Sequence, residues 1–159
     1  VLVESLHLRA RAAVAAASDP ATPSASRASL ISGAERDARR LRRIDARWAV
    51  ALGELILSGT ATLRRDWRAA IAHLDTAETA FERENMGLYL AVTRWRRAEL
   101  IGATGGERLH ALADGWMRAQ AIVNASRFSQ MLVPGTFTAM PSTAASPPGA
   151  VVNQAVETV

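Results

Sequence analysis

The segment DWRAAIAHLDTAETAFER, residues 66–83, carries the clearest structural signal in the chain. Its apolar residues recur three or four positions apart, which is the spacing of one face of an α-helix. These residues are Trp67, Ala70, Ile71, Leu74, Ala77 and Phe81. Asp66 stands directly before them, where a short acidic side chain can accept hydrogen bonds from free backbone N–H groups. The segment therefore predicts an amphipathic helix with Asp66 as its N-cap.

The residues on both sides of this segment show the same periodicity, and almost no stretch alternates as a half-buried strand would. Upstream, three helices are expected, over about residues 2–17, from about Ser24 to Leu41, and from about Asp45 to Leu63. Downstream, three more are expected, from Leu88 to the glycines at 102–106, from about Glu107 through Met117, and over residues 126–132. The sequence therefore predicts an all-α fold.

Polar and glycine-rich positions predict where these helices begin and end. Either Ser24 or Ser26 can cap the second helix, while Asp45 and Asn124 can cap the third and the last. We expect residues 102–106 to form a turn between two helices, because glycines favour chain reversals. The helix that follows is expected to bury its apolar face: Leu109, Leu112, Ala113, Trp116 and Met117.

Small residues recur at comparable places in the second, fourth and sixth helices. Ala38, Ala77 and Ala113 lie 39 and 36 residues apart, near the period of two-helix repeats. A small residue lets one helix approach its partner closely, and bulky Phe81 and Met117 follow four positions after the last two alanines. The spacing predicts one domain over residues 1–133, built of three antiparallel helical hairpins that stack as a short right-handed solenoid.

The composition changes after the last expected helix. Beyond Gly135 the chain reads TFTAMPSTAASPPGAVVNQAVETV, with three prolines and Glu157 as its one charged side chain. Such a segment has too few large apolar residues to form a core of its own. Residues 134–159 are therefore predicted to be a disordered tail.

The composition of the 159 residues, 49% of them hydrophobic, is that of an ordinary globular domain. The absence of cysteine excludes disulfides, thiolate zinc sites and iron–sulfur clusters. No apolar run is long enough for a membrane helix. Glu4, Arg9 and Arg11 interrupt the first segment, where a signal peptide would need unbroken apolar residues. We therefore expect a cytoplasmic protein.

All 19 basic residues are arginine, and the formal net charge is +4. Five of these arginines cluster over residues 36–43. Such a cluster suggests an Arg-rich nucleic-acid-binding or transcription-regulator-associated module, because arginines neutralise phosphates. Glu35, Asp37 and Asp45 interleave with the cluster and count against this alternative. The polar face of a repeat helix is the preferred interpretation.

The titratable side chains do not form a catalytic or metal-binding pattern in the sequence. His7, His73 and His110 fall on three different expected helices, without a second histidine or a carboxylate at metal-ligand spacing. The carboxylates Asp75, Glu78 and Glu82 share one face of their helix, where we expect them to be solvated and to lie opposite arginines such as Arg68 and Arg83. We therefore predict no catalytic residue, no metal and no cofactor, and a chain that is not an enzyme.

The segment from Arg39 to Gly135 resembles a known helical region. One stretch ends a helix at Phe81 and continues through Met86, Leu88 and Tyr89. Another supplies Trp116, Met117, Gln120, Ile122, Asn124, Arg127, Met131, Leu132, Pro134 and Gly135. Together they resemble the C-terminal tetratricopeptide-like (TPR-like) tail of multidomain serine/threonine protein kinases of myxobacteria and related soil bacteria. Ala121, Ala125 and Phe128 depart from that pattern, where Gly, Pro and Met would be expected.

This resemblance implies a regulatory or sensor module in signalling, which binds a protein or peptide partner. It brings no kinase chemistry to the chain, which has neither lysine nor an Asp-Phe-Gly triplet. In TPR-like arrays the first helix of each pair lines a concave surface, so polar positions of the third and fifth helices are the expected contacts. The predicted partner-binding residues are Arg47, Glu54, Arg94 and Arg97, whose arginines could bind an acidic peptide.

Overall fold

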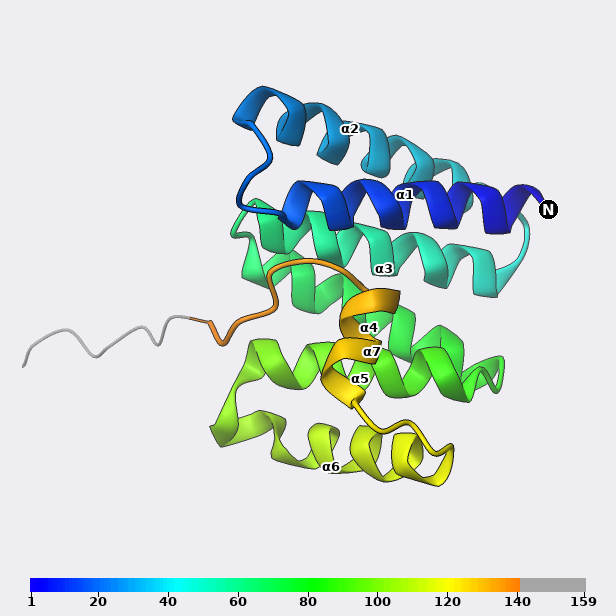
Figure 1. Ribbon diagram of the computed structural model, residues 1–159. Coiled ribbons are helices and arrows are strands. Elements are labelled where there is room, and N and C mark those ends of the chain that lie inside the picture. The colour runs from blue at the N-terminus through cyan, green and yellow to red at the C-terminus, as the bar shows by residue number, and fades with distance from the viewer. Residues whose placement is uncertain (141–159) are drawn as a thin grey trace, which may run out of the picture.

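The computed structural model describes residues 1–140, apart from the side chain at position 104. These residues form seven α-helices joined by loops (Figure 1). They are α1 (Leu2–Ser18), α2 (Ser24–Leu41), α3 (Arg47–Leu63), α4 (Trp67–Arg83), α5 (Gly87–Ile101), α6 (Ala103–Ala119) and α7 (Ala125–Leu132). No strand occurs among these residues, and the predicted all-α class is confirmed. None of these helices combines the length and the apolar character that crossing a bilayer requires.

Consecutive helices form the most extensive contacts of the fold. They pair as α1 with α2, α3 with α4 and α5 with α6, and smaller contacts join α2 to α3, α4 to α5 and α1 to α3. Figure 1 shows these helices running side by side, from α1 and α2 at the top to α6 at the bottom. The short α7 runs across them and packs on α5.

The small residues that the sequence analysis singled out lie where helices meet. Ala38, Ala77 and Ala113 are each completely buried, as are the bulky Phe81 and Met117 that follow in α4 and α6. A methyl side chain at these points lets neighbouring helices approach closely, while the larger side chains fill the space beside them. Four positions after Ala38, directly beyond the end of α2, stands Arg42, which forms an ion pair instead.

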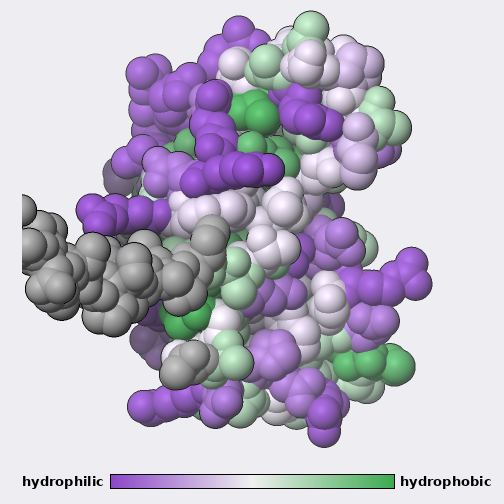
Figure 2. Space-filling view, turned by 90° about the vertical axis from the view of Figure 1, so that its left-hand side faces the viewer, coloured by the Kyte–Doolittle hydropathy of each residue, from purple (hydrophilic) through white to green (hydrophobic). Residues whose placement is uncertain are grey.

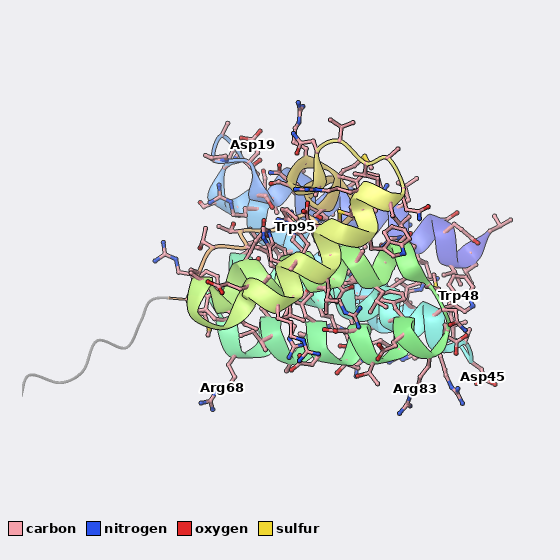
Figure 3. All side chains as sticks on the ribbon, turned by 90° about the horizontal axis from the view of Figure 1, so that it is seen from below. Asp19, Asp45, Trp48, Arg68, Arg83 and Trp95 are labelled. Atoms are coloured by element: carbon pink, nitrogen blue, oxygen red, sulfur yellow. The ribbon has the colours of Figure 1, made fainter. Side chains whose placement is uncertain are left out.

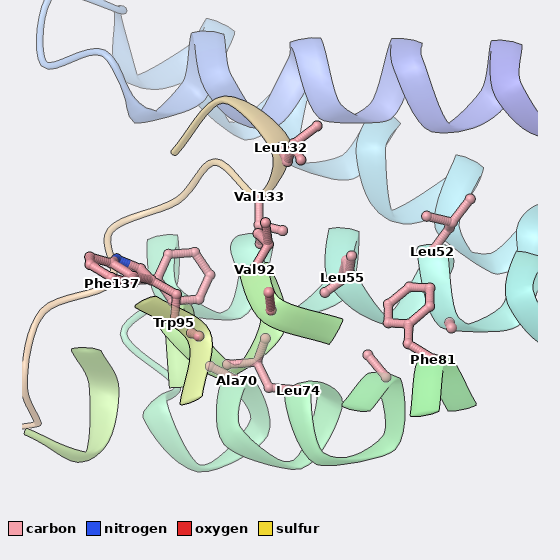
Figure 4. Close-up of a cluster of buried hydrophobic side chains, with 14 of the residues drawn as sticks. Leu52, Leu55, Ala70, Leu74, Phe81, Val92, Trp95, Leu132, Val133 and Phe137 are labelled. Carbon is pink, nitrogen blue, oxygen red and sulfur yellow. The ribbon is translucent and has the colours of Figure 1, made fainter. Parts of the chain in front are cut away.

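One hydrophobic core extends through most of the molecule (Figure 4). Leu55 of α3, Leu74 and Phe81 of α4 and Val92 of α5 lie at its centre. The Phe81 ring stacks on Tyr89 with 5.2 Å between centroids. On the face shown in Figure 2, hydrophilic residues predominate and hydrophobic ones reach the surface only in small patches. The apolar faces of the helices pack against each other in the core.

Two of the predicted helix caps are confirmed. Asp66 Oδ1 accepts a hydrogen bond of 3.0 Å from the Ala69 N–H, and Asn124 Oδ1 accepts one of 2.9 Å from the Arg127 N–H. The other predicted caps are wrong. Ala46, not Asp45, is the N-cap of α3, and α2 already begins at Ser24, after Pro23. Proline suits the start of a helix because its fixed φ and missing N–H cost nothing there.

The expected turn over residues 102–106 is corrected to a single residue. Gly102 has φ +77°, and α6 begins directly after it at Ala103. Gly106 lies inside the helix, where an added Cβ would come within 2.5 Å of the Ala98 carbonyl oxygen. This glycine therefore serves the close approach of α5 and α6 rather than a turn.

One apolar residue of α6 departs from its predicted burial. Leu112 is 48% exposed, whereas Ala113 and Met117 are completely buried. The reason is that α6 lies at the edge of the molecule and packs mainly on α5, so only a narrow stripe of its surface is covered.

The predicted boundary of the disordered tail at Pro134 is also corrected. Residues 134–140 lie against the helices, with Pro134 and Phe137 buried. The Met140 N–H donates a 3.0 Å hydrogen bond to the Leu100 carbonyl. The large buried ring of Phe137 holds this segment against the helices, which its small neighbouring residues could not do. The rest of the predicted tail, residues 141–159, lies outside the described residues.

Candidate functional site

A shallow pocket of about 480 Å³ lies between the start of α3 and the end of α4. Its lining consists of two arginines, two threonines and two apolar residues: Arg47, Arg83, Thr76, Thr79, Val50 and Ala80. The hydroxyl of Thr76 donates to the Ala72 carbonyl, and that of Thr79 to the Asp75 carbonyl. The arginines are therefore the strong donors of the pocket, which suits an anionic group with an apolar part beside it.

The two arginines of this pocket have accessible guanidinium groups. The Arg47 side chain is 74% exposed, and its nearest carboxylate oxygen, Glu84 Oε1, is 3.9 Å from Nη1. Arg83 projects from α4 into solvent, as does Arg68 (Figure 3). A long, exposed ion pair contributes little to stability, so Arg47 can exchange Glu84 for an external carboxylate at little cost.

Glu54 lies next to the pocket along α3 but is only 4% exposed. Its Oε1 lies 2.9 Å from Arg42 Nε of α2, and its Oε2 lies 2.6 Å from His73 Nδ1 of α4. These contacts join three helices through one carboxylate. Both oxygens of the predicted partner-binding residue Glu54 are therefore already engaged inside the protein.

Arg94 and Arg97 of α5 share the carboxylate of Glu78 on α4. Arg94 Nε and Arg97 Nη1 each lie 2.8 Å from one of its oxygens. Burial opposes a charge on Arg94, but the hydrogen bonds from Arg94 to Glu78 and Glu82 outweigh it and raise the pKa of this guanidinium. Arg97 also forms an ion pair of 2.6 Å with Asp75.

The expected arrangement of the α4 carboxylates is therefore corrected. Asp75, Glu78 and Glu82 pair with Arg94 and Arg97 across the contact between α4 and α5. They do not face Arg68 and Arg83, which project into solvent (Figure 3). The spacing within one helix predicts only contacts along that helix, whereas this pairing depends on how two helices meet.

The four predicted partner-binding residues are thus not brought together. Glu54, Arg94 and Arg97 face the even-numbered helices and form intramolecular pairs there. Arg47 alone of the four presents an exposed charge, and it shares its pocket with Arg83. Sequence reasoning missed Arg83 as a binding residue, although its place in the last turn of the most clearly predicted helix was a usable signal.

The three histidines lie in separate surroundings. His7 is buried, and burial together with the nearby Arg11 lowers its pKa to about 4. His110 lies against Trp95 with 3.9 Å between ring centroids. His73 contacts Glu54, a pairing that sequence spacing did not reveal because the two residues are on different helices. Within residues 1–140, no group of three His, Asp or Glu side chains is arranged to hold a metal ion.

The acidic residues next to the arginine cluster form ion pairs with arginines that lie outside the cluster. Glu35 pairs with Arg64 of α3 at 2.9 Å. Asp37 is held by both Nε and Nη2 of Arg9 of α1, at 2.7 and 2.6 Å. Four arginines of the cluster remain exposed and form no salt bridge with any described residue: Arg36, Arg39, Arg40 and Arg43.

No protein-family model, curated protein or solved structure matches the chain.

Proposed function

We propose that the chain is a non-catalytic helical-repeat module that binds a protein or peptide partner. In this proposal α1–α6 form three antiparallel hairpins of a short TPR-like, right-handed solenoid. The module would be the regulatory or sensor C-terminal part of a bacterial serine/threonine protein kinase in the cytoplasm, or a detached relative of such a part.

The repeated helix contact is the observation that carries this proposal. Ala38, Ala77 and Ala113 are completely buried in α2, α4 and α6, and the last two occupy the same position of their helices. Each of these helices packs most extensively on the helix directly before or after it in its pair. A series of similar units with contacts between neighbours is the architecture of repeat proteins, whose extended surfaces bind other proteins.

The pocket between α3 and α4 supports an acidic peptide as the partner. Arg47 and Arg83 border an apolar surface formed by Val50 and Ala80. A carboxylate of the partner can accept paired hydrogen bonds from either guanidinium, while a neighbouring apolar side chain contacts that surface. Arg47 is the residue of this pocket that the sequence predicted.

The binding experiment captures partners of the full chain from the source cells, identifies them, and measures their affinities for purified variants. Arg47→Ala and Arg83→Ala should each weaken binding several-fold, because each removes one guanidinium from the pocket. Arg68→Ala is the matched control, since it removes an exposed arginine of α4 that does not line the pocket. A partner that binds all three variants equally would show that another surface is used, and a chain that retains no partner would contradict the interaction function.

The link to a kinase is tested by reading the genomic DNA upstream of the codon for Val1 in the same frame. A reading frame that continues into a kinase domain would support the regulatory role. A stop codon directly upstream would instead favour a free-standing module.

The arginine cluster of α2 supports nucleic acid as a second candidate partner. Because Glu35 and Asp37 are engaged by Arg64 and Arg9, they do not neutralise the exposed arginines around them. Arg36, Arg39 and Arg40 of α2 and Arg43 in the turn that follows form no salt bridge with a described residue and can contact successive phosphates.

This second candidate predicts that binding to a DNA duplex falls steeply between about 50 and 200 mM salt. The double variant Arg40→Ala, Arg43→Ala should abolish binding, whereas Arg65→Ala, Arg68→Ala removes the same charge from exposed positions outside the cluster. Equal loss in both double variants would show that only net charge matters and would exclude a specific surface on α2.

A further inference from the structure

The C-terminal segment of the described chain lies in a groove that α1, α3 and α5 form. Figure 1 shows residues 133–140 leaving α7 and passing over α3. At Gly59 of α3, an added Cβ would come within 2.5 Å of the Pro134 carbonyl oxygen and 3.0 Å of Val14 Cγ1 of α1. A glycine at this position therefore lets the segment approach the helix backbone directly.

Side chains of the groove bind the main chain of this segment. Arg96 Nε of α5 donates a 2.9 Å hydrogen bond to the Val133 carbonyl, and Thr62 Oγ1 of α3 accepts one of 3.0 Å from the Thr136 N–H. The Arg96 guanidinium also lies 4.7 Å from the centre of the Phe137 ring. Protein grooves recognise extended peptides by this combination of main-chain hydrogen bonds and side-chain pockets.

Two apolar side chains anchor the segment on either side of these hydrogen bonds. Val133 is fully buried and Phe137 nearly so, four positions further on. Figure 4 shows Val133 beside Val92, and Phe137 near Trp95. Between them stands Gly135 with φ +148°, a conformation that side chains disfavour. The groove therefore fits an extended segment that carries an aliphatic residue, then Pro-Gly, then an aromatic residue.

The resident segment leaves one buried donor of the groove unpaired, and a separate pocket lies open beside the segment. Arg96 is only 5% exposed, yet its Nη2 has no hydrogen-bond partner among the described residues. Beside the segment, a pocket of about 340 Å³ remains open between α1 and α7. A segment with an additional oxygen acceptor near Arg96 would satisfy this buried donor, whose unpaired state costs free energy.

From these contacts we propose that the groove is a peptide-binding site and that residues 132–140 are its built-in, displaceable occupant. The incoming ligand is an extended segment of a partner protein that carries an aliphatic residue, Pro-Gly and an aromatic residue at the spacing of Val133 to Phe137. The proposal rests on the interaction function proposed above, but it concerns a different face from the pocket of Arg47 and Arg83.

The test uses the full-length chain and a fluorescent peptide with the sequence of residues 129–140. Gly135→Val should eject the resident segment, because the added Cβ would lie 2.7 Å from Phe137 Cε2 and 2.8 Å from Thr62 Oγ1. The wild-type chain should bind the peptide at least about tenfold more weakly than this variant, because its own tethered segment competes at high effective concentration.

A matched pair of threonine variants then tests the groove itself. In the Gly135→Val background, Thr62→Val removes the acceptor for the Thr136 N–H and should weaken peptide binding about three- to tenfold. Thr60→Val is the control, since Thr60 is equally buried in α3 and its hydroxyl donates to the Leu57 carbonyl. Equal effects of both variants would overturn the proposal.

Folding of each variant is checked by helical circular dichroism and thermal unfolding, and Phe137→Ala provides a second way to loosen the segment. If both opened chains are folded but bind no peptide, or if both unfold, the segment is a fixed part of the core and the inference is overturned. If partners still depend on Arg47 in that case, the proposed interaction function stands while this groove does not.

Discussion

At the scale of single residues, three helices end with a residue other than glycine in the left-handed backbone conformation. Arg65, Asn85 and Ala121 have φ values of 60°, 54° and 58° and follow α3, α4 and α6. After each, the next N–H donates back to a carbonyl of the last helical turn, as Ile122 does to Met117 at 3.0 Å. This arrangement satisfies carbonyls at the helix ends. A side chain with a Cβ is nevertheless strained there.

Ala121→Gly should therefore raise the free energy of unfolding by about 1 kcal/mol, because glycine adopts positive φ without the steric cost of a Cβ. Chemical denaturation of the two proteins measures the difference. Ala119→Gly, in the last turn of α6, should have the opposite sign because glycine disfavours helix. Equal destabilisation by both glycines would contradict the strain at position 121.

A second prediction at this scale concerns pH and His7. Its pKa is lowered from 6.5 to about 4 in the folded protein, mainly by burial and further by Arg11. The unfolded chain therefore binds more protons between these values, and stability falls as pH decreases from 6.5 through about 4. The loss contributed by His7 should approach about 3 kcal/mol at the acidic end.

Urea denaturation at several pH values between about 7 and 4 measures this effect. His7→Leu retains an apolar contact with Tyr89, whose ring centroid lies 6.1 Å from that of His7, but it cannot titrate. Its stability should depend less on pH over the same range. Identical pH profiles for the two chains would show that burial of His7 does not control its protonation.

At the scale of helices, two of the three glycines of α6, Gly106 and Gly115, differ in their surroundings. An added Cβ at Gly106 would come within 2.5 Å of the Ala98 carbonyl oxygen, whereas at Gly115 it would meet nothing within 4 Å. Both residues lie inside the same helix. Local helix preference acts equally on them, and only the contact with α5 distinguishes them.

Gly106→Ala should therefore lower the free energy of unfolding by about 1–3 kcal/mol, because α5 and α6 must separate. Gly115→Ala should raise it by about 0.5–1 kcal/mol through helix preference alone. Thermal unfolding of both variants provides the measurement. A stabilising effect of Gly106→Ala would contradict the close approach of these helices.

At the scale of the whole molecule, α1 contacts both its neighbour α2 and the distant helix α5. His7 of α1 contacts Tyr89 of α5, and Arg9 of α1 binds Asp37 of α2. The main core continues from Leu6 of α1 to Phe137 of the C-terminal segment. A second, smaller cluster lies between α1, α2 and α3, with Val14 and Ile56 among its members.

These links predict that the molecule unfolds as one cooperative unit. The four tryptophans, which report by fluorescence, lie in α3, α4, α5 and α6; they are Trp48, Trp67, Trp95 and Trp116. Circular dichroism reports on all the helices. Urea transitions followed by fluorescence and by circular dichroism should coincide. An earlier loss of circular dichroism would indicate that α1 and α2 unfold separately with the smaller cluster.

Much of the fold could be predicted because helix formation depends on residues close together in the chain. The periodicity after Asp66, its cap on Ala69 and the cap at Asn124 are all local features. Gly105 and Gly106 of α6 were predicted to lie in a turn because the local preference of glycine is the same in a turn and in a close helix contact. Only the position of α5 separates these two roles.

The candidate site was less predictable, because charged side chains choose partners across helix contacts. Arg47 was predicted to bind a partner and is exposed beside a pocket, but its neighbour there, Arg83, comes from α4. Glu54 was predicted to be a polar contact of a binding surface, and nothing local identifies its burial or its partners Arg42 and His73. The sequence by itself determined the helices and the all-α class, since backbone hydrogen bonds and apolar periodicity act over a few residues. Only the tertiary structure decided which charges are paired and which face the C-terminal segment covers, since these depend on desolvation and distance between remote parts of the chain.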